Sequence, residues 1–200
     1  MKKVKNQTFW GVSVVAVALA LLLGIPASAQ DEEPPAKKMK SIHIQSTAMG
    51  TSTQLGRIVN IDIIINEFSS TADQKGLIAA FSEKGNEGLT RAVDKMGAKG
   101  RIRITGTLGY DLNYIKQFQN PDGTTKIRFL TDRPIQFGEA WGSTRSMDYS
   151  ISGGEIILSK GKGKSSGILF PACQLKLDKE NTLEIEAFQN PWKLENIMLR

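Results

Sequence analysis

Histidine and cysteine, the side chains that most often hold metals or act as nucleophiles, are almost absent from this sequence. His43 is the only histidine and Cys173 the only cysteine among 200 residues. One histidine excludes a multi-histidine metal site and leaves a single possible base for serine or cysteine catalysis. One cysteine excludes an intramolecular disulfide, so the fold must be stabilised by packing. We therefore predict no metal, no other cofactor and no catalytic residues, and a protein that is not an enzyme.

Both residues also stand in patterns typical of structural positions. His43 alternates with two isoleucines, which places it on the polar face of an early strand. Cys173 shares an apolar face with Leu175, which indicates a buried thiol, whereas a reactive thiol needs an accessible, electropositive setting. Neither residue is therefore a candidate for a site.

The first 29 residues have the layout of a secretory signal peptide. Lysines at positions 2, 3 and 5 precede an apolar run over residues 9–25, and Ala27-Ser28-Ala29 supplies the small residues of a cleavage site. Cleavage after Ala29 predicts a secreted or periplasmic protein with no stable membrane anchor. The alternative is an uncleaved anchor, because the apolar run is close to the shortest length that spans a bilayer.

Little excess charge remains once that segment is removed. The net charge of +6 includes the three N-terminal lysines, so the mature chain carries about +3. So small an excess, with basic residues that do not interleave with aromatics, predicts no nucleic acid partner. Residues 30–40, QDEEPPAKKMK, have almost no apolar content and are predicted to form a disordered linker. Residues 41–200 are predicted to form a single globular domain.

Alternation of apolar and polar residues is the dominant pattern of that domain. The central stretch, Arg57–Phe68, places four β-branched residues on one side at a period of two: Val59, Ile61, Ile63 and Ile65. After Gly100 the same alternation returns in segments separated by turns such as the one over residues 120–123. The pattern predicts a mainly β fold, either an antiparallel β-barrel or a β-sandwich.

One stretch departs from this alternation and predicts a pair of helices. Ser70 stands three residues before Asp73, as in a capping box, and apolar residues then follow at helical spacing. Gly85 is expected to end the first helix, and a second helical pattern runs from residue 87. We expect helices near 71–84 and 87–96, inserted between early strands of an α+β domain.

The loop over residues 137–149, FGEAWGSTRSMDY, is the most site-like stretch of the chain. It combines an aromatic side chain with charged groups between glycines, and the candidate binding residues are Trp141, Arg145, Asp148 and Tyr149. The alternative is structural: Trp141 would close one end of the core and Arg145 would pair with Asp148.

Two resemblances accompany these residues. The runs RPIQFGEA (133–140), TRSMDY (144–149) and PACQLKL (171–177) resemble segments of exported bacterial proteins of uncharacterised function, which implies a secreted domain and no particular activity. The order of strands and helices resembles the calycin-type barrels in which two short helices cap the mouth. This second resemblance implies a cavity for a small apolar ligand, which Phe81, Tyr110 and Tyr114 would line.

These observations leave three functions open. The first is a non-catalytic module that binds a small apolar ligand. The second is a structural or protein-interaction module of the cell envelope, which would use the Trp141 loop or an exposed strand edge. The third is an envelope hydrolase that would use loop carboxylates such as Glu139 and Asp148, although no spacing brings two of them together.

Overall fold

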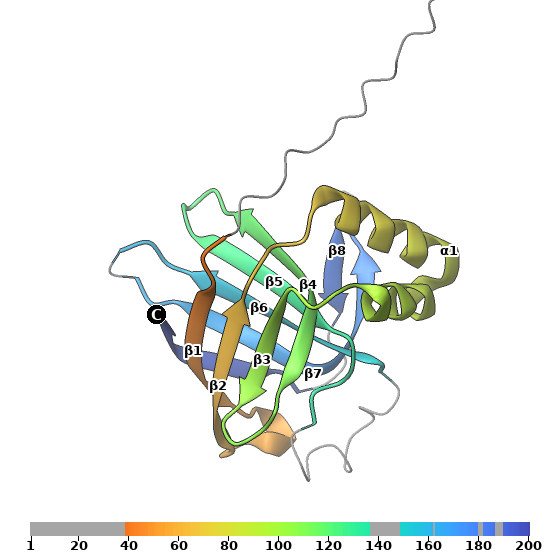
Figure 1. Ribbon diagram of the computed structural model, residues 1–200. Helices are drawn as coiled ribbons and strands as arrows, with labels where there is room; N and C mark the ends of the chain where they lie inside the picture. Colours follow the sequence, from red (N-terminus) through yellow and green to blue (C-terminus); the bar gives the residue numbers. More distant parts are fainter. Residues whose placement is uncertain (1–38, 137–148, 162, 180–181, 187–189) are drawn as a thin grey trace, which may run out of the picture. The chain divides into compact units, whose positions relative to one another are not determined.

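Eight antiparallel strands pair edge to edge until the sheet closes on itself (Figure 1). The computed structural model describes residues 39–136, 149–161, 163–179, 182–186 and 190–200, which belong to one compact unit, Lys37–Arg200. In order around the ring, the strands are β1 (Ile42–Met49), β2 (Ile58–Ile65), β3 (Gly100–Ile104), β4 (Tyr110–Gln119), β5 (Thr125–Thr131), β6 (Ile151–Leu158), β7 (Ser166–Leu177) and β9 (Trp192–Leu199). The predicted antiparallel β fold is confirmed, and it is a barrel.

Two short elements of the described chain lie outside this ring of strands. A short 3-10 helix, η1 (Ser52–Gln54), connects β1 to β2. A ninth strand, β8 (Leu183–Glu186), pairs with the C-terminal part of β7, whereas the N-terminal part of β7 pairs with β9. The long strand β7 therefore belongs to the barrel in its first half and to a two-stranded ribbon in its second.

The interior of the barrel is filled by apolar side chains. The isoleucines of β2 that alternate in the sequence point inward, as predicted, and Phe129 and Trp192 are among the largest buried side chains. A barrel of eight strands is just wide enough for side chains to fill it. The buried members of this first core are Ile44, Ala48, Ile61, Ile63, Ile65, Ile102, Leu112, Ile115, Ile127, Phe129, Ile135, Ile156, Leu169, Trp192 and Leu194.

A glycine makes room for the ring of Phe129 in this core. Phe129 on β5 lies opposite Gly154 on β6 in the strand register. A Cβ atom built on Gly154 would stand 2.3 Å from the Cζ atom of Phe129, well inside van der Waals contact. The phenyl ring therefore occupies the space that a side chain at position 154 would need.

A second core lies on the outside of the barrel wall. Helix α1 (Thr71–Lys95) packs its apolar residues against β4, β5 and β7 (Figure 1). The buried members of this second core are Leu77, Leu89, Val93, Tyr114, Leu130, Ile151, Cys173, Leu175 and Leu183. The helix covers the side of the barrel and does not cap its mouth, because its apolar face matches the apolar outer face of these strands. The buried position predicted for Cys173 is confirmed.

A single, bent helix stands where the sequence predicts a pair. The backbone leaves helical values at Lys84 (φ −136°) and Gly85 (φ +57°), so the chain changes direction at the predicted stop. The turn needs only these two residues, because glycine adopts a positive φ without strain. No connecting loop separates the two parts, and the expected helices near 71–84 and 87–96 are one element. Within the part of the chain that the structure describes, no helix combines the length and the apolar content needed to cross a membrane.

The start of α1 is held by the predicted capping box. The backbone N–H of Asp73 donates to Ser70 Oγ at 3.0 Å, and the backbone N–H of Ser70 donates to Asp73 Oδ2 at 2.8 Å. Lys99 Nζ lies 3.4 Å from Asp73 Oδ2 and 2.8 Å from Glu67 Oε1. The box and the lysine together anchor the helix start beside β3.

The capping box predicts a loss of stability in acid. Burial alone would raise the pKa of the Asp73 carboxyl, but the Ser70 N–H and the Lys99 ammonium together outweigh it and lower that pKa below the ordinary 3.8. The stability that Asp73 contributes is therefore present above pH 3.8 and is lost as the pH falls through the lower value of the folded protein. We expect Asp73→Asn to destabilise the protein near neutral pH, and the difference from wild type to shrink in strong acid. Urea unfolding of both proteins over this pH range tests it, and a difference that stays constant with pH would contradict it.

Candidate functional site

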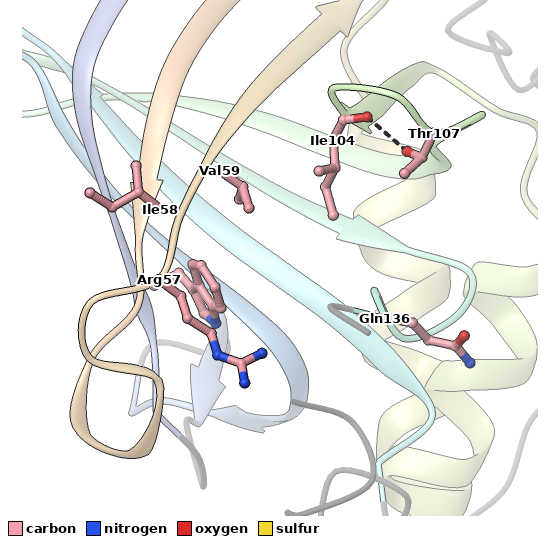
Figure 2. A pocket seen from close by; sticks show the side chains of 7 residues that line it. Arg57, Ile58, Val59, Ile104, Thr107 and Gln136 are labelled. Carbon is pink, nitrogen blue, oxygen red and sulfur yellow. Dashed lines mark hydrogen bonds between the residues drawn. The ribbon is translucent and has the colours of Figure 1, made fainter. Parts of the chain in front are cut away.

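A pocket of about 440 Å³ opens at the end of the barrel where η1 connects β1 to β2 (Figure 2). We call it the end pocket. Among the described residues, four separate stretches contribute to it: the start of β2, the end of β3 with its turn, the segment after β5, and the start of β9. The lining residues are Arg57, Ile58, Val59, Ile104, Thr107, Gln136 and Trp192.

The walls of the end pocket are continuous with the barrel core. Trp192 is buried among the interior side chains, and it also lines the pocket. Val59 and Ile104 are partly buried and pack against the same core. Ile58, at the rim, is 60% exposed. Strands of a closed barrel hold these apolar walls in place, so the pocket is preformed.

Polar groups of the end pocket come mainly from its rim. Thr107 Oγ1 donates to the backbone oxygen of Ile104 at 2.9 Å, drawn as the dashed line in Figure 2. The backbone N–H of Gln136 donates to the hydroxyl of Tyr110 at 3.0 Å. The guanidinium of Arg57 adds a positive charge. Apolar walls with a few polar groups suit a small apolar or amphiphilic molecule.

The aromatic residues proposed from the sequence do not converge on one cavity. Tyr110 is partly buried against the barrel core and adjoins the end pocket through Gln136, but it does not line the pocket. Tyr114 lies in the second core, where burial raises its pKa to about 12. Phe81 packs against that second core as well. The expected lining of Phe81, Tyr110 and Tyr114 is therefore split between the two sides of the barrel wall.

A bulge in β4 explains this separation. Leu112 pairs with Thr131 and Tyr114 pairs with Leu130, so Asn113 is an extra residue on β4. One extra residue reverses which side chains face inward. Leu112 and Ile115 consequently point into the barrel, whereas Tyr114 points out toward α1.

Tyr149 lies at a different pocket, between α1 and β7. This second pocket has a volume of about 410 Å³, and its lining includes Asn86, Arg91, Tyr149 and Cys173. The other members of the predicted binding loop, Trp141, Arg145 and Asp148, lie outside the described residues, as does Glu139.

Polar groups of the second pocket hold α1 against β7. The side-chain amide of Asn86 donates to the backbone oxygen of Leu175 at 3.1 Å, and its oxygen accepts from the backbone N–H of Leu175 at 2.8 Å. These two bonds take the place of a neighbouring strand on that side of β7. Arg91 pairs with Glu87 at 2.6 Å. Burial raises the pKa of the Cys173 thiol to about 12, so it stays protonated at neutral pH and is a poor nucleophile.

The arginines on the outer faces of β3 and β5 are ion-paired. Arg101 lies 3.2 Å from Asp111, Arg103 lies 3.1 Å from Asp62, and Arg128 lies 2.6 Å from Glu155. Each positive charge is therefore offset locally by a carboxylate. Among the described residues, no three carboxylate, thiol or imidazole side chains gather in a way that could hold a metal ion.

Comparisons with known proteins add no relative to this picture. No family model matches the chain, and neither the search of curated proteins nor the search of solved structures found a match. What the site can bind follows from its own geometry.

Sequence reasoning missed the residues of the end pocket, although one signal pointed to them. Leu55 and Leu108 are apolar residues in turns, and each precedes a glycine with positive φ, Gly56 or Gly109. Turn positions face water, so a large apolar side chain there calls for an explanation. Both turns lie beside the end pocket, next to Arg57 and Thr107.

Proposed function

We propose that this protein is a non-catalytic binding module that holds a small, mainly apolar molecule in the end pocket. The observation that carries the proposal is the wall shared by pocket and core: Trp192, Val59 and Ile104 contribute to both. A ligand that covers these side chains removes apolar surface from water without reorganising the barrel.

The end pocket, and not the centre of the barrel, is the place proposed for the ligand. The interior is occupied by its own side chains, from Ile44 on β1 to Leu194 on β9. A volume of about 440 Å³ falls within the range of small-molecule pockets in proteins. The ligand would therefore lie at the mouth, in contact with water on one side.

The lining supports binding without catalysis. Its described residues carry one guanidinium, one hydroxyl and one amide, and the remaining members are apolar. The hydroxyl of Thr107 already donates to a backbone oxygen, and no described lining residue offers a carboxylate or imidazole as its base. The signal-peptide layout of residues 1–29 supports export, so the ligand would be met outside the cytoplasm.

Replacing Ile58 with asparagine should weaken the binding of an apolar fluorescent probe, anilinonaphthalene sulfonate, by about tenfold. Ile58 lines the pocket from its rim, and a polar side chain there removes apolar contact with the ligand. Fluorescence titration of the probe into the exported protein measures the dissociation constant.

The matched control is Ile157→Asn, on the outer face of β6 and outside the pocket lining. It should bind the probe as wild type does. Equal weakening in both variants, or no saturable binding by wild type, would overturn the proposal. Native mass spectrometry of the exported protein, without detergent, would give the mass of any natural ligand that is retained.

A further inference from the structure

We infer that the end of the barrel around the end pocket docks onto an anionic lipid surface, from which the pocket takes an alkyl-chain amphiphile. The identity of this ligand rests on the proposed function, but the surface contact stands on separate observations. Its parts are the η1 loop, the turn between β3 and β4, and the basic residues beside them.

The first observation is where the exposed apolar side chains lie. The three most exposed large hydrophobic residues of the described chain are Leu108 (89%), Leu55 (81%) and Ile58 (60%). Leu55 follows η1, Ile58 begins β2, and Leu108 lies in the turn between β3 and β4. Single exposed hydrophobics are common, whereas exposed hydrophobic side chains that gather at one place mark an interaction site.

The strand register brings these two turns together. Met49 pairs with Ile58 across the β1–β2 connection, and Ile61 pairs with Ile104 on β3. Both connections therefore leave the barrel at the same end (Figure 1). The end pocket lies between them, because Ile58 lines it from one side and Thr107 from the other.

The second observation is the charge beside these turns. Arg57 and Lys193 are exposed at this end, where Lys193 pairs with Met49 in the register of β9 and β1. Arg133 is exposed in the segment after β5, and its guanidinium lies 5.4 Å from the ring of Tyr110. Among the described residues, three cations therefore stand at this end beside two carboxylates, the half-buried Asp132 and the exposed Glu195 on β9. A basic rim around apolar tips is complementary to anionic headgroups over acyl chains.

The arrangement favours a lipid surface over a protein partner. The leucines stand on two turns with a pocket between them, so they form two projections and not one flat patch. A stable protein interface needs about 800 Å² of complementary surface on each partner. A bilayer is fluid and adapts to separate projections, and each leucine can enter the acyl boundary alone.

This docking would place the mouth of the end pocket against the lipid. An alkyl chain leaving the bilayer would contact Ile58, Ile104 and Trp192, while its head group stays near Arg57 and Thr107 at the rim. The apolar walls and the polar rim then match the two ends of one amphiphile.

Co-flotation with vesicles tests the surface contact directly. The exported wild-type protein should bind vesicles of phosphatidylcholine with phosphatidylglycerol, and this binding should weaken as the salt concentration rises. It should bind vesicles of phosphatidylcholine alone only weakly. The double variant Leu55→Ser/Leu108→Ser should lower the partition coefficient at least about tenfold, because both inserted side chains are lost. The matched control is Met198→Ser/Leu199→Ser, which removes two side chains of 55% and 58% exposure at the other end of β9 and should bind as wild type does.

Each outcome decides the inference. The inference would be overturned if the wild-type protein did not bind anionic vesicles. It would also be overturned if the double serine variant, with unchanged far-UV circular dichroism, still bound them as wild type does. In the first case a protein partner would become the alternative occupant of this end. Failure of the surface contact is distinguishable from failure of the proposed function. If only the surface contact is wrong, vesicle binding is absent and Ile58→Asn still weakens binding of the soluble probe. If only the proposed function is wrong, the probe does not bind and the protein still binds anionic vesicles.

Discussion

Replacing Arg128 with alanine should lower the free energy of unfolding by about 3 kcal/mol, as expected when one partner of a buried ion pair is removed. The Arg128 side chain is only 6% exposed, and its Nε lies 2.6 Å from Glu155 Oε1. Its Nη1 also donates to the backbone oxygen of Leu183 on β8, and its guanidinium lies 5.4 Å from the Phe118 ring. Alanine would leave the Glu155 carboxylate and the Leu183 oxygen without their donor.

The expected loss of stability comes from the burial of the ion pair, and a control variant separates it from the loss of a charge alone. Arg103→Ala is the matched control, because Arg103 pairs with Asp62 at 3.1 Å but its side chain is 51% exposed, so its loss should cost less than about 1 kcal/mol. The double variant Arg128→Met/Glu155→Leu should recover much of the stability, since apolar side chains can replace a buried pair. Urea unfolding followed by circular dichroism measures all three. Equal losses for Arg128→Ala and Arg103→Ala would refute the role given to Arg128; Arg128→Lys serves if the alanine variant does not fold.

Replacing Phe129 with alanine should lower the free energy of unfolding by about 3–5 kcal/mol, because it leaves a cavity among the interior side chains of the barrel. Phe129 is fully buried, and its ring fills the space above Gly154. Gly154→Ala in the wild-type background should cost about 1–3 kcal/mol, because the new methyl group would overlap the ring. The same change in the Phe129→Ala background should be neutral or stabilising, since the methyl group then enters a cavity.

The reversal of sign is the test of this pair. A double-mutant cycle from urea unfolding gives the coupling between the two positions. The matched control for the glycine is Gly76→Ala in α1, where a Cβ atom would meet nothing within 4 Å. This substitution should stabilise the helix by up to about 1 kcal/mol. Additive effects of Phe129→Ala and Gly154→Ala would show that the two residues do not share one space.

Local features of the fold could be predicted from short stretches of sequence. The inward isoleucines of β2 follow from a period of two, and the start of α1 follows from the spacing of Ser70 and Asp73. The sequence also predicts a break at Gly85, although as the end of one helix, whereas the structure has a bend within a single helix there. Each of these depends on neighbours within a few residues, so the sequence by itself determined them.

The candidate site could not be predicted in the same way. Alternation along β4 places Tyr110 and Tyr114 on one face, but the extra residue Asn113 sends Tyr114 into the second core. The predicted lining of a capped barrel therefore fell on both sides of its wall. A bulge is set by the partner strand, and the pairing of Leu112 with Thr131 is invisible in the pattern of β4 alone.

The sequence by itself thus determined the type of each element, mainly β strands and one capped helical stretch. It also determined that the thiol of Cys173 is buried. Only the tertiary structure decided that the sheet closes through β9 and β1, that α1 covers the side of the barrel, and that Ile58, Thr107 and Trp192 meet at one pocket. Periodicity says that a segment has an apolar face, but not which apolar face it will meet. That choice belongs to contacts between residues far apart in the chain, where packing of the whole set selects one arrangement.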